Sequence, residues 1–272
     1  PRRYWAIAPI WLAMIMSVLD ASIPNVALPT IAREVGATPA NSVWVVQGYQ
    51  LATVMVLLPF AAIGDRIGYR RVYIAGLIVF TLGSLGCALS QSLDHLVISR
   101  ATQGLGAGGV MSINPALIRF TYPKAQLGRG LAYNVVVIAV SSAVAPSLSA
   151  AILAVGSWEW LFGGNVPIGV LVIAVAWRAL PRTEGSGRPF DYLAAVLNAV
   201  AFGALILGAE MTVSKGPAAG LFLLAVSAAV FLLLVPRELT RHAPLVPVDL
   251  MRNATFAISS ITATLSFAAQ ML

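Results

Sequence analysis

Residues 5–31 read WAIAPIWLAMIMSVLDASIPNVALPTI, an apolar run of membrane-spanning length with one acid, Asp20, near its middle. An ionised carboxylate at membrane depth costs at least about 2.5–3.5 kcal/mol, and such residues usually mark an ion, proton or substrate pathway. The half of the run that follows Asp20 contains Pro24, Asn25 and Pro29. A membrane helix tolerates these residues only where neighbouring helices or an aqueous cavity satisfy the exposed backbone. The run therefore predicts a spanning helix that carries a functional acid.

The composition of the whole chain indicates the same environment. Of its 272 residues, 59% are hydrophobic and only 10% are charged, whereas a soluble domain has about 45–50% apolar and about 25% charged residues. The apolar runs repeat and are each long enough to span a bilayer as a helix. A membrane β-barrel would show short segments of alternating polarity instead. The fold class is therefore predicted as an all-α integral membrane protein.

Nine spans are predicted, and they suggest three regions. A linker-like stretch rich in Gly, Pro and Ser at 181–190 follows the sixth span. We therefore expect a six-helix bundle over 1–181, a linker region with two extra spans over 182–252, and the first helix of a second bundle over 253–272. The last run stops without a terminating signal, so we expect the chain to be a portion of a longer protein. The predicted spans are 5–31, 43–63, 72–90, 95–119, 130–154, 160–180, 191–211, 218–236 and 254–272.

The net charge of +7 would by itself also suit nucleic-acid binding. The basic residues, however, gather in alternate connections, while the opposite connections hold only Arg33 and Lys215. This is the positive-inside asymmetry. It predicts a multi-pass protein of the cytoplasmic (inner) membrane with its N-terminus in the cytoplasm, and it excludes nucleic acid as a partner. The basic residues assigned to the cytoplasmic side are Arg2, Arg3, Arg66, Arg70, Arg71, Arg119, Lys124, Arg129, Arg178, Arg182, Arg188, Arg237, Arg241 and Arg252.

A second charge, Arg100, lies inside the fourth span. It is about 9 Å from the outer end of that span, and Asp20 is about 16 Å from the outer end of the first. The two residues could share a cavity, through Gln103 or water, and so set a proton affinity that changes as the cavity opens and closes. The alternative is a static ion pair that only fixes helix packing.

The connection at 64–71 reads GDRIGYRR, an acid and a basic cluster around a tight glycine turn. Asp65 could cap a helix or pair with an arginine, and such a pairing can be made and broken as helices rock. The alternative is a basic loop that only sets the topology.

Further polar residues occur within or beside the spans, with two interpretations each. Asn25, Gln47, Gln50 and Asn134 could line a cavity or form interhelical hydrogen bonds. Tyr49 could stack on an aromatic cation or anchor at the interface. Glu210 could bind cations or pair with Lys215 at a helix end.

Other patterns predict no chemistry. Residues 104–109 match the dinucleotide pattern G-x-G-x-x-G, but no strand precedes them, so Gly104 and Gly108 are interpreted as a helix contact face. His95 and His242 lack metal-ligand spacing and Cys87 has no second cysteine, so no metal, cofactor or disulfide is predicted. No hydrolytic arrangement occurs in the spans, so no enzyme is expected.

Several of these stretches, in this order, resemble the major facilitator superfamily, and within it the fourteen-helix drug:proton antiporters. The first run is similar to the first-helix motif, and 64–71 to the loop signature, with Ala61 and Tyr69 departing from it. LVISRATQGLGAG (96–108) resembles the fourth-helix motif of proton-coupled members, and WEWLF (158–162) with NVPIG (165–169) resembles the entry to helix six. APSLSA (145–150) keeps the proline of the helix-five motif but lacks its glycines.

The resemblance implies a proton-coupled exporter of hydrophobic, often cationic, compounds that works by alternating access. Its partners would be such a substrate, protons, the lipid bilayer and the C-terminal half of the same transporter. An exporter of an endogenous metabolite, sugar or amino acid, and a non-transporting membrane scaffold, are the alternatives. The implied roles are proton or substrate coupling for Asp20, Arg100 and Gln103, shaping of helix five for Pro146, and a cytoplasmic latch for Asp65, Arg66, Gly68, Arg70 and Arg71.

Overall fold

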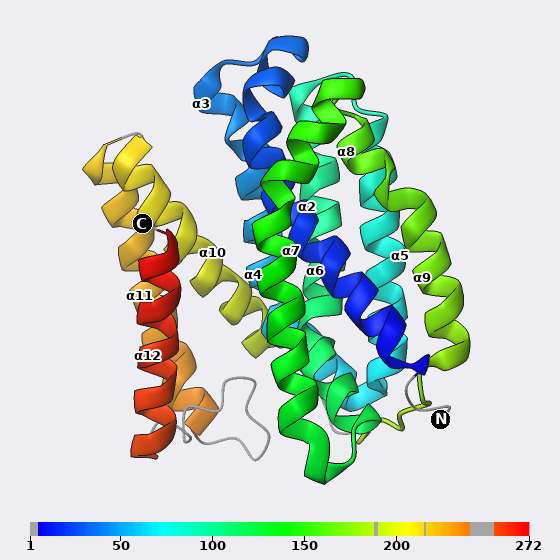
Figure 1. Cartoon of the computed structure of the whole chain (residues 1–272). Helices are drawn as coiled ribbons and strands as arrows, with labels where there is room; N and C mark the ends of the chain where they lie inside the picture. The colour runs from blue at the N-terminus through cyan, green and yellow to red at the C-terminus, as the bar shows by residue number, and fades with distance from the viewer. Residues whose placement is uncertain (1–4, 188–189, 215, 240–252, 272) are drawn as a thin grey trace. The chain divides into compact units, whose positions relative to one another are not determined.

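The computed structural model describes residues 5–187, 190–214, 216–239 and 253–271, and these residues form helices and no strand (Figure 1). The chain divides into two compact units, Pro1–Phe190 and Asp191–Leu272. The all-α prediction is confirmed, and each of the nine predicted spans corresponds to a helix.

The helices of the first unit follow one another closely along the chain. They are α2 (Ile7–Glu34), α3 (Pro39–Ser42), α4 (Trp44–Ile67), α5 (Tyr69–Ala88), α6 (Leu93–Thr121), the 3₁₀ turn η1 (Lys124–Gln126), α7 (Leu127–Val155), α8 (Trp160–Gly163) and α9 (Asn165–Ala179). The second unit contains α10 (Tyr192–Ser214), α11 (Pro217–Leu239) and α12 (Ala254–Met271).

Seven helical segments among the described residues are long and apolar enough to cross a membrane. The helix α6 is outside this group because its sequence is more polar, with Arg100, Gln103 and Asn114 along it. All three side chains are buried. The polar sequence of α6 therefore fits a helix that packs against α2, α4 and α5 within its unit.

Two glycines show how closely α6 approaches its neighbours. A Cβ atom on Gly106 would lie 2.2 Å from the backbone nitrogen of Phe80 in α5. A Cβ atom on Gly104 would lie 2.3 Å from the carbonyl oxygen of Tyr49 in α4. No side chain fits in either gap, because Cβ atoms do not approach backbone atoms so closely. The predicted contact face at Gly104 is confirmed, and α6 brings its polar side chains within reach of two other helices.

The helix α7 packs against α2 through a narrow stripe. Its five buried residues are Gly130, Asn134, Ser141, Ala145 and Ser149, spaced so that they share one face. The hydroxyl of Ser149 donates a 3.1 Å hydrogen bond to the carbonyl oxygen of Ile23. Pro146 is exposed, so the helix-shaping role predicted for it stays a prediction.

The first unit ends nine residues later than the boundary predicted at 181. The reason is that the Gly-rich stretch packs on the end of α4. The backbone N–H of Ser186 donates to the carbonyl oxygen of Asp65 at 2.8 Å. A Cβ atom on Gly185 would lie 1.9 Å from the carbonyl oxygen of Arg66. A stretch of linker composition therefore belongs to the bundle.

In the second unit, α10 and α11 pack together. The hydroxyl of Ser227 donates to the carbonyl oxygen of Ala201 at 2.8 Å. An ion pair of 2.9 Å joins Arg237 to Asp191. Much of the connection predicted between α11 and α12 lies outside the described residues, as do the N-terminal Arg2 and Arg3.

Candidate functional site

The site forms around Asp20, at a point where α2 lacks a backbone hydrogen bond. Pro24 lies inside this helix and has no N–H, so it cannot donate to the carbonyl oxygen of Asp20 four residues earlier. Instead, Nη2 of Arg100 donates to that oxygen at 3.3 Å. Both the backbone carbonyl oxygen and the carboxylate of Asp20 therefore bind the guanidinium of Arg100.

The carboxylate of Asp20 is bound by three side chains from two other helices. Its Oδ2 forms an ion pair with Nη1 of Arg100, and the two side chains are 1% and 0% exposed. Its Oδ1 accepts hydrogen bonds from Nε2 of Gln103 at 2.8 Å and from Nδ2 of Asn165 at 2.7 Å. The donors come from α6 and from the first residue of α9. The arrangement compensates a buried charge with a counter-ion and further hydrogen bonds, as such a charge requires.

The guanidinium of Arg100 has neutral partners as well. Its Nε donates to the carbonyl oxygen of Val45 at 2.9 Å, and its Nη1 donates to Oε1 of Gln103 at 2.6 Å. Its central carbon lies 4.3 Å from the ring centroid of Tyr49 and 5.3 Å from that of Phe162. Aromatic faces at such distances attract a cation. The cation is therefore held by Val45, Gln103 and two aromatic rings as well as by Asp20.

Gln103 connects this pair to α5. Its Nε2 also donates to the hydroxyl of Ser84 at 2.7 Å, and the thiol of Cys87 lies 3.6 Å from its Oε1. All these side chains are buried. The network thus extends over α2, α4, α5, α6 and α9.

The structure brings together the three residues predicted for coupling, Asp20, Arg100 and Gln103. They are joined by direct contacts. In this conformation the acid is therefore enclosed in an ion pair, as in the alternative of a static pair, and the coupling role of the three residues stays a prediction.

Two members of the network, Asn165 and Ser84, were not predicted as site residues. Asn165 begins an apolar helix, and Ser84 lies in the middle of one. The only sequence signal for Asn165 and Ser84 was that each is a polar residue in an apolar run. It was weak, because a hydroxyl or amide costs far less in such a run than a charge does.

Replacing Asn165 with alanine should destabilise the first unit. The change removes a hydrogen bond to a charged group, and such a bond contributes about 1.5–3 kcal/mol. We expect a lower melting temperature of the purified protein in detergent. Asn25→Ala is the matched control, since Asn25 is exposed on α2. Equal melting temperatures for the two variants would contradict the role assigned to Asn165.

The residues predicted to line a cavity lie in different environments. Tyr49 is 2% exposed with its ring face against Arg100, so an aromatic cation cannot stack on that face. Asn25 is exposed beside a pocket of about 470 Å³ at the end of α2, and Gln50 is exposed on α4. Gln47 is partly buried, and its Oε1 has no hydrogen-bond partner in the described part of the chain.

The last two predicted lining residues lie on α7 and α10. Asn134 is buried in the α7 stripe, and its Oδ1 has no hydrogen-bond partner among the described residues. Glu210 is partly buried in α10, while Lys215, its alternative partner, lies outside the described residues. Cavity lining by any of these residues stays a prediction.

The loop signature forms a tight turn between two helices. α4 ends at Ile67, Gly68 adopts a φ of +100°, and α5 begins at Tyr69. The hydroxyl of Tyr69 donates to the carboxylate of Asp65, and Nη2 of Arg70 donates to the carbonyl oxygen of Trp177 in α9. The tyrosine that departs from the family pattern therefore binds the acid of the motif.

The remaining latch residues lie close by. Arg66 is in the last turn of α4, and Arg71 follows Arg70 at the start of α5, exposed. Opening and closing of this turn stays a prediction. In the described part of the chain, no group of three or more His, Cys, Asp or Glu residues is arranged to hold a metal ion.

Similarity to known proteins extends along the chain. Residues 10–272 match the Major Facilitator Superfamily. The chain is 47% identical over 280 residues to the uncharacterized transporter YebQ of Escherichia coli (strain K12), covering 100% of this chain and 60% of that protein. It is 31% identical over 265 residues to the multidrug export protein EmrB of Haemophilus influenzae, covering 94% of this chain and 51% of that protein.

A solved structure shows the same fold. The proton:xylose symporter XylE superposes with a TM-score of 0.60 at 12% identity, over 88% of this chain and 54% of that one. The chain thus spans about half to three-fifths of the length of these proteins. Family match and fold agree with the resemblance seen in its motifs, and the chain therefore belongs to the Major Facilitator Superfamily of membrane transporters and is not an enzyme.

Proposed function

We propose that the full-length protein is a proton-coupled antiporter that exports hydrophobic, often cationic, compounds by alternating access. The observation that carries this proposal is the enclosed acid, Asp20, paired with Arg100 and bound by two amides. In this proposal α10 and α11 are linker helices between two bundles, and α12 is the first helix of the second bundle. The similarity to a multidrug export protein supports the substrate class.

In the proposed mechanism, the ion pair is the resting form of the site with its proton released. A proton that reaches Asp20 neutralises its carboxylate, so Arg100 loses its counter-ion. The positive charge of Arg100 is then no longer compensated, and it raises the electrostatic potential near the site. A positively charged substrate is then repelled, and it binds again when the proton leaves. Because the network is closed here, water reaches Asp20 only in another conformation, and rocking of two bundles around a midplane site provides such a conformation.

We further propose that the protein lies in the inner membrane with its N-terminus in the cytoplasm. The support is the charge pattern, because the turn with Arg66, Arg70 and Arg71 then faces the cytoplasm together with the α6–α7 connection. The turn would form the latch that opens and closes between the two access states.

The experiment uses everted membrane vesicles that contain the full-length protein. A proton gradient with the vesicle interior acidic should drive accumulation of a fluorescent lipophilic cation inside the vesicles. An uncoupler should abolish this accumulation. Unchanged accumulation after uncoupling would contradict proton coupling. Accumulation of a labelled sugar or amino acid in place of the cation would instead identify the protein as a metabolite exporter, and transport of none of these would favour a scaffold.

A further inference from the structure

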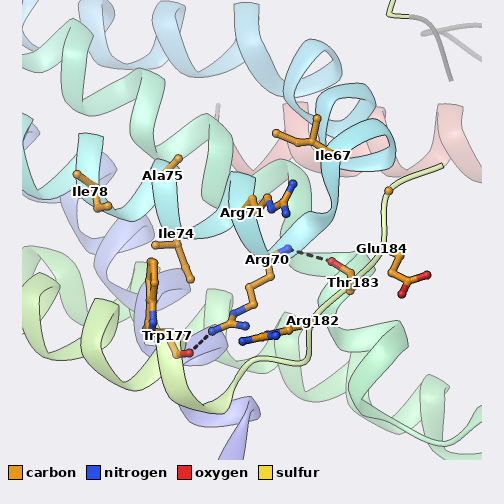
Figure 2. A pocket seen from close by; sticks show the side chains of 11 residues that line it. Ile67, Arg70, Arg71, Ile74, Ala75, Ile78, Trp177, Arg182, Thr183 and Glu184 are labelled. Atoms are coloured by element: carbon orange, nitrogen blue, oxygen red, sulfur yellow. Dashed lines mark hydrogen bonds between the residues drawn. The ribbon is translucent and has the colours of Figure 1, made fainter. Parts of the chain in front are cut away.

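A second site lies away from Asp20, where the first turn of α5 meets the end of α9 and the segment that follows it (Figure 2). It is a cavity of about 740 Å³ within the first unit. Three arginines line it, Arg70, Arg71 and Arg182. The proton-coupling proposal uses neither the cavity nor Arg182.

The polar end of this cavity is positively charged. Against the three arginines stands one lining acid, Glu184, so the lining residues carry +3 − 1 = +2. Figure 2 shows the side chains of Arg70 and Arg182 reaching the same end of the cavity beside Trp177, whereas Glu184 points away from them. Two guanidinium groups that converge without an acid between them form a site for an anion.

The hydrogen bonds of Arg70 leave a buried donor of its guanidinium unsatisfied. Its Nη2 donates to the carbonyl oxygen of Trp177, and its central carbon lies 5.8 Å from the centroid of that ring. Its backbone N–H donates to the hydroxyl of Thr183 at 3.2 Å. Its Nε is buried and has no partner among the described residues. The side chain is therefore fixed in place with a donor still to be satisfied.

Farther along α5, the lining of the cavity is apolar. Ile74, Ala75 and Ile78 follow one another along α5, away from the arginines. Ile78 is 41% exposed and Trp177 is 62% exposed, so this wall opens toward the surroundings of the unit. A tryptophan and arginines at the end of a spanning helix are typical of the membrane–water interface. The cavity thus offers cations at one end and a hydrocarbon surface along its side.

We infer that this cavity binds an anionic phospholipid, with the phosphodiester on Arg70 and Arg182 and an acyl chain along Ile74 and Ile78. Guanidinium groups bind phosphate through two parallel hydrogen bonds. Basic pockets between spanning helices at the cytoplasmic side suit anionic headgroups. A zwitterionic lipid would leave the net positive charge of the lining uncompensated, so the site discriminates by charge.

The test is native mass spectrometry of the full-length protein from detergent micelles that contain equal amounts of phosphatidylglycerol and phosphatidylcholine. We expect the wild type to retain phosphatidylglycerol in preference. Arg182→Gln should weaken that preference roughly fivefold, the effect of one basic residue at an anionic membrane surface. Arg178→Gln is the matched control, because Arg178 is exposed in the last turn of α9 and outside the cavity lining.

Each outcome decides the inference. Loss of preference in Arg182→Gln with retention in Arg178→Gln supports it. Equal retention of the two lipids by the wild type, or an equal loss in both variants, would overturn it. Displacement of phosphatidylglycerol by millimolar inorganic phosphate would show a site for free phosphate and would also overturn the lipid assignment. None of these results depends on transport, so a failure here leaves the antiporter proposal standing.

Discussion

Asp20→Asn should abolish proton-driven export by the full-length protein, because an amide cannot take up and release the coupling proton. The same change should also lower stability. It leaves the guanidinium of Arg100 buried without its counter-ion, and breaking a buried pair in this way costs about 3–5 kcal/mol. Loss of transport alone would therefore not separate a coupling role from a packing role.

A double variant separates the two roles. Asp20→Asn combined with Arg100→Gln removes both charges, so the large cost of an unpaired charge disappears and the melting temperature should recover toward the wild-type value. Export in everted vesicles should stay absent, because the titratable group is still missing. Recovery of both stability and export in the double variant would show that the pair only holds the helices together.

Gly106→Ala should be among the most destabilising single changes in the first unit. The added methyl group would meet the backbone nitrogen of Phe80 at 2.2 Å and the carbonyl oxygen of Gly76 at 2.7 Å. Backbone atoms cannot turn aside as a flexible side chain can, so α5 and α6 must separate. Overpacking costs typically about 1–3 kcal/mol, and we expect a large fall in melting temperature and in the amount of protein inserted.

Gly128→Ala is the matched control. Gly128 lies in the first turn of α7, and a Cβ atom there would have no neighbour within 4 Å. Alanine is favoured over glycine in a helix by about 0.5–1 kcal/mol, so this variant should be as stable as the wild type or slightly more stable. A similar loss for both variants would contradict the close crossing of α5 and α6.

The helices and the two charges at the centre of the site could be predicted from the sequence. Charges are rare in apolar runs, so Asp20 and Arg100 stand out, and each needs a partner that only the other can supply at that depth. The spans themselves follow from length and hydropathy. What the sequence could not specify was that the two residues meet directly and that Asn165 completes the set, because those contacts depend on how α2, α6 and α9 pack.

Smaller features escaped prediction because their signals are local. The short helix α3 begins at Pro39 after Thr38, whose side chain accepts a 3.3 Å hydrogen bond from the backbone N–H of Asn41. This is an ordinary start signal for a helix, but it lies between two long spans that dominate the pattern. The stretch after 181 has the composition of a linker, and only its packing against the end of α4 shows that it belongs to the bundle.

The proline four residues after the acid gives the central cation a second function. Since Arg100 also binds the carbonyl oxygens of Asp20 and Val45 and the amide oxygen of Gln103, most of its anchors keep their strength when the carboxylate is neutral. The arginine can therefore stay where it is while its counter-charge comes and goes. The protein could then change its affinity for a positively charged substrate without having to reposition Arg100 itself.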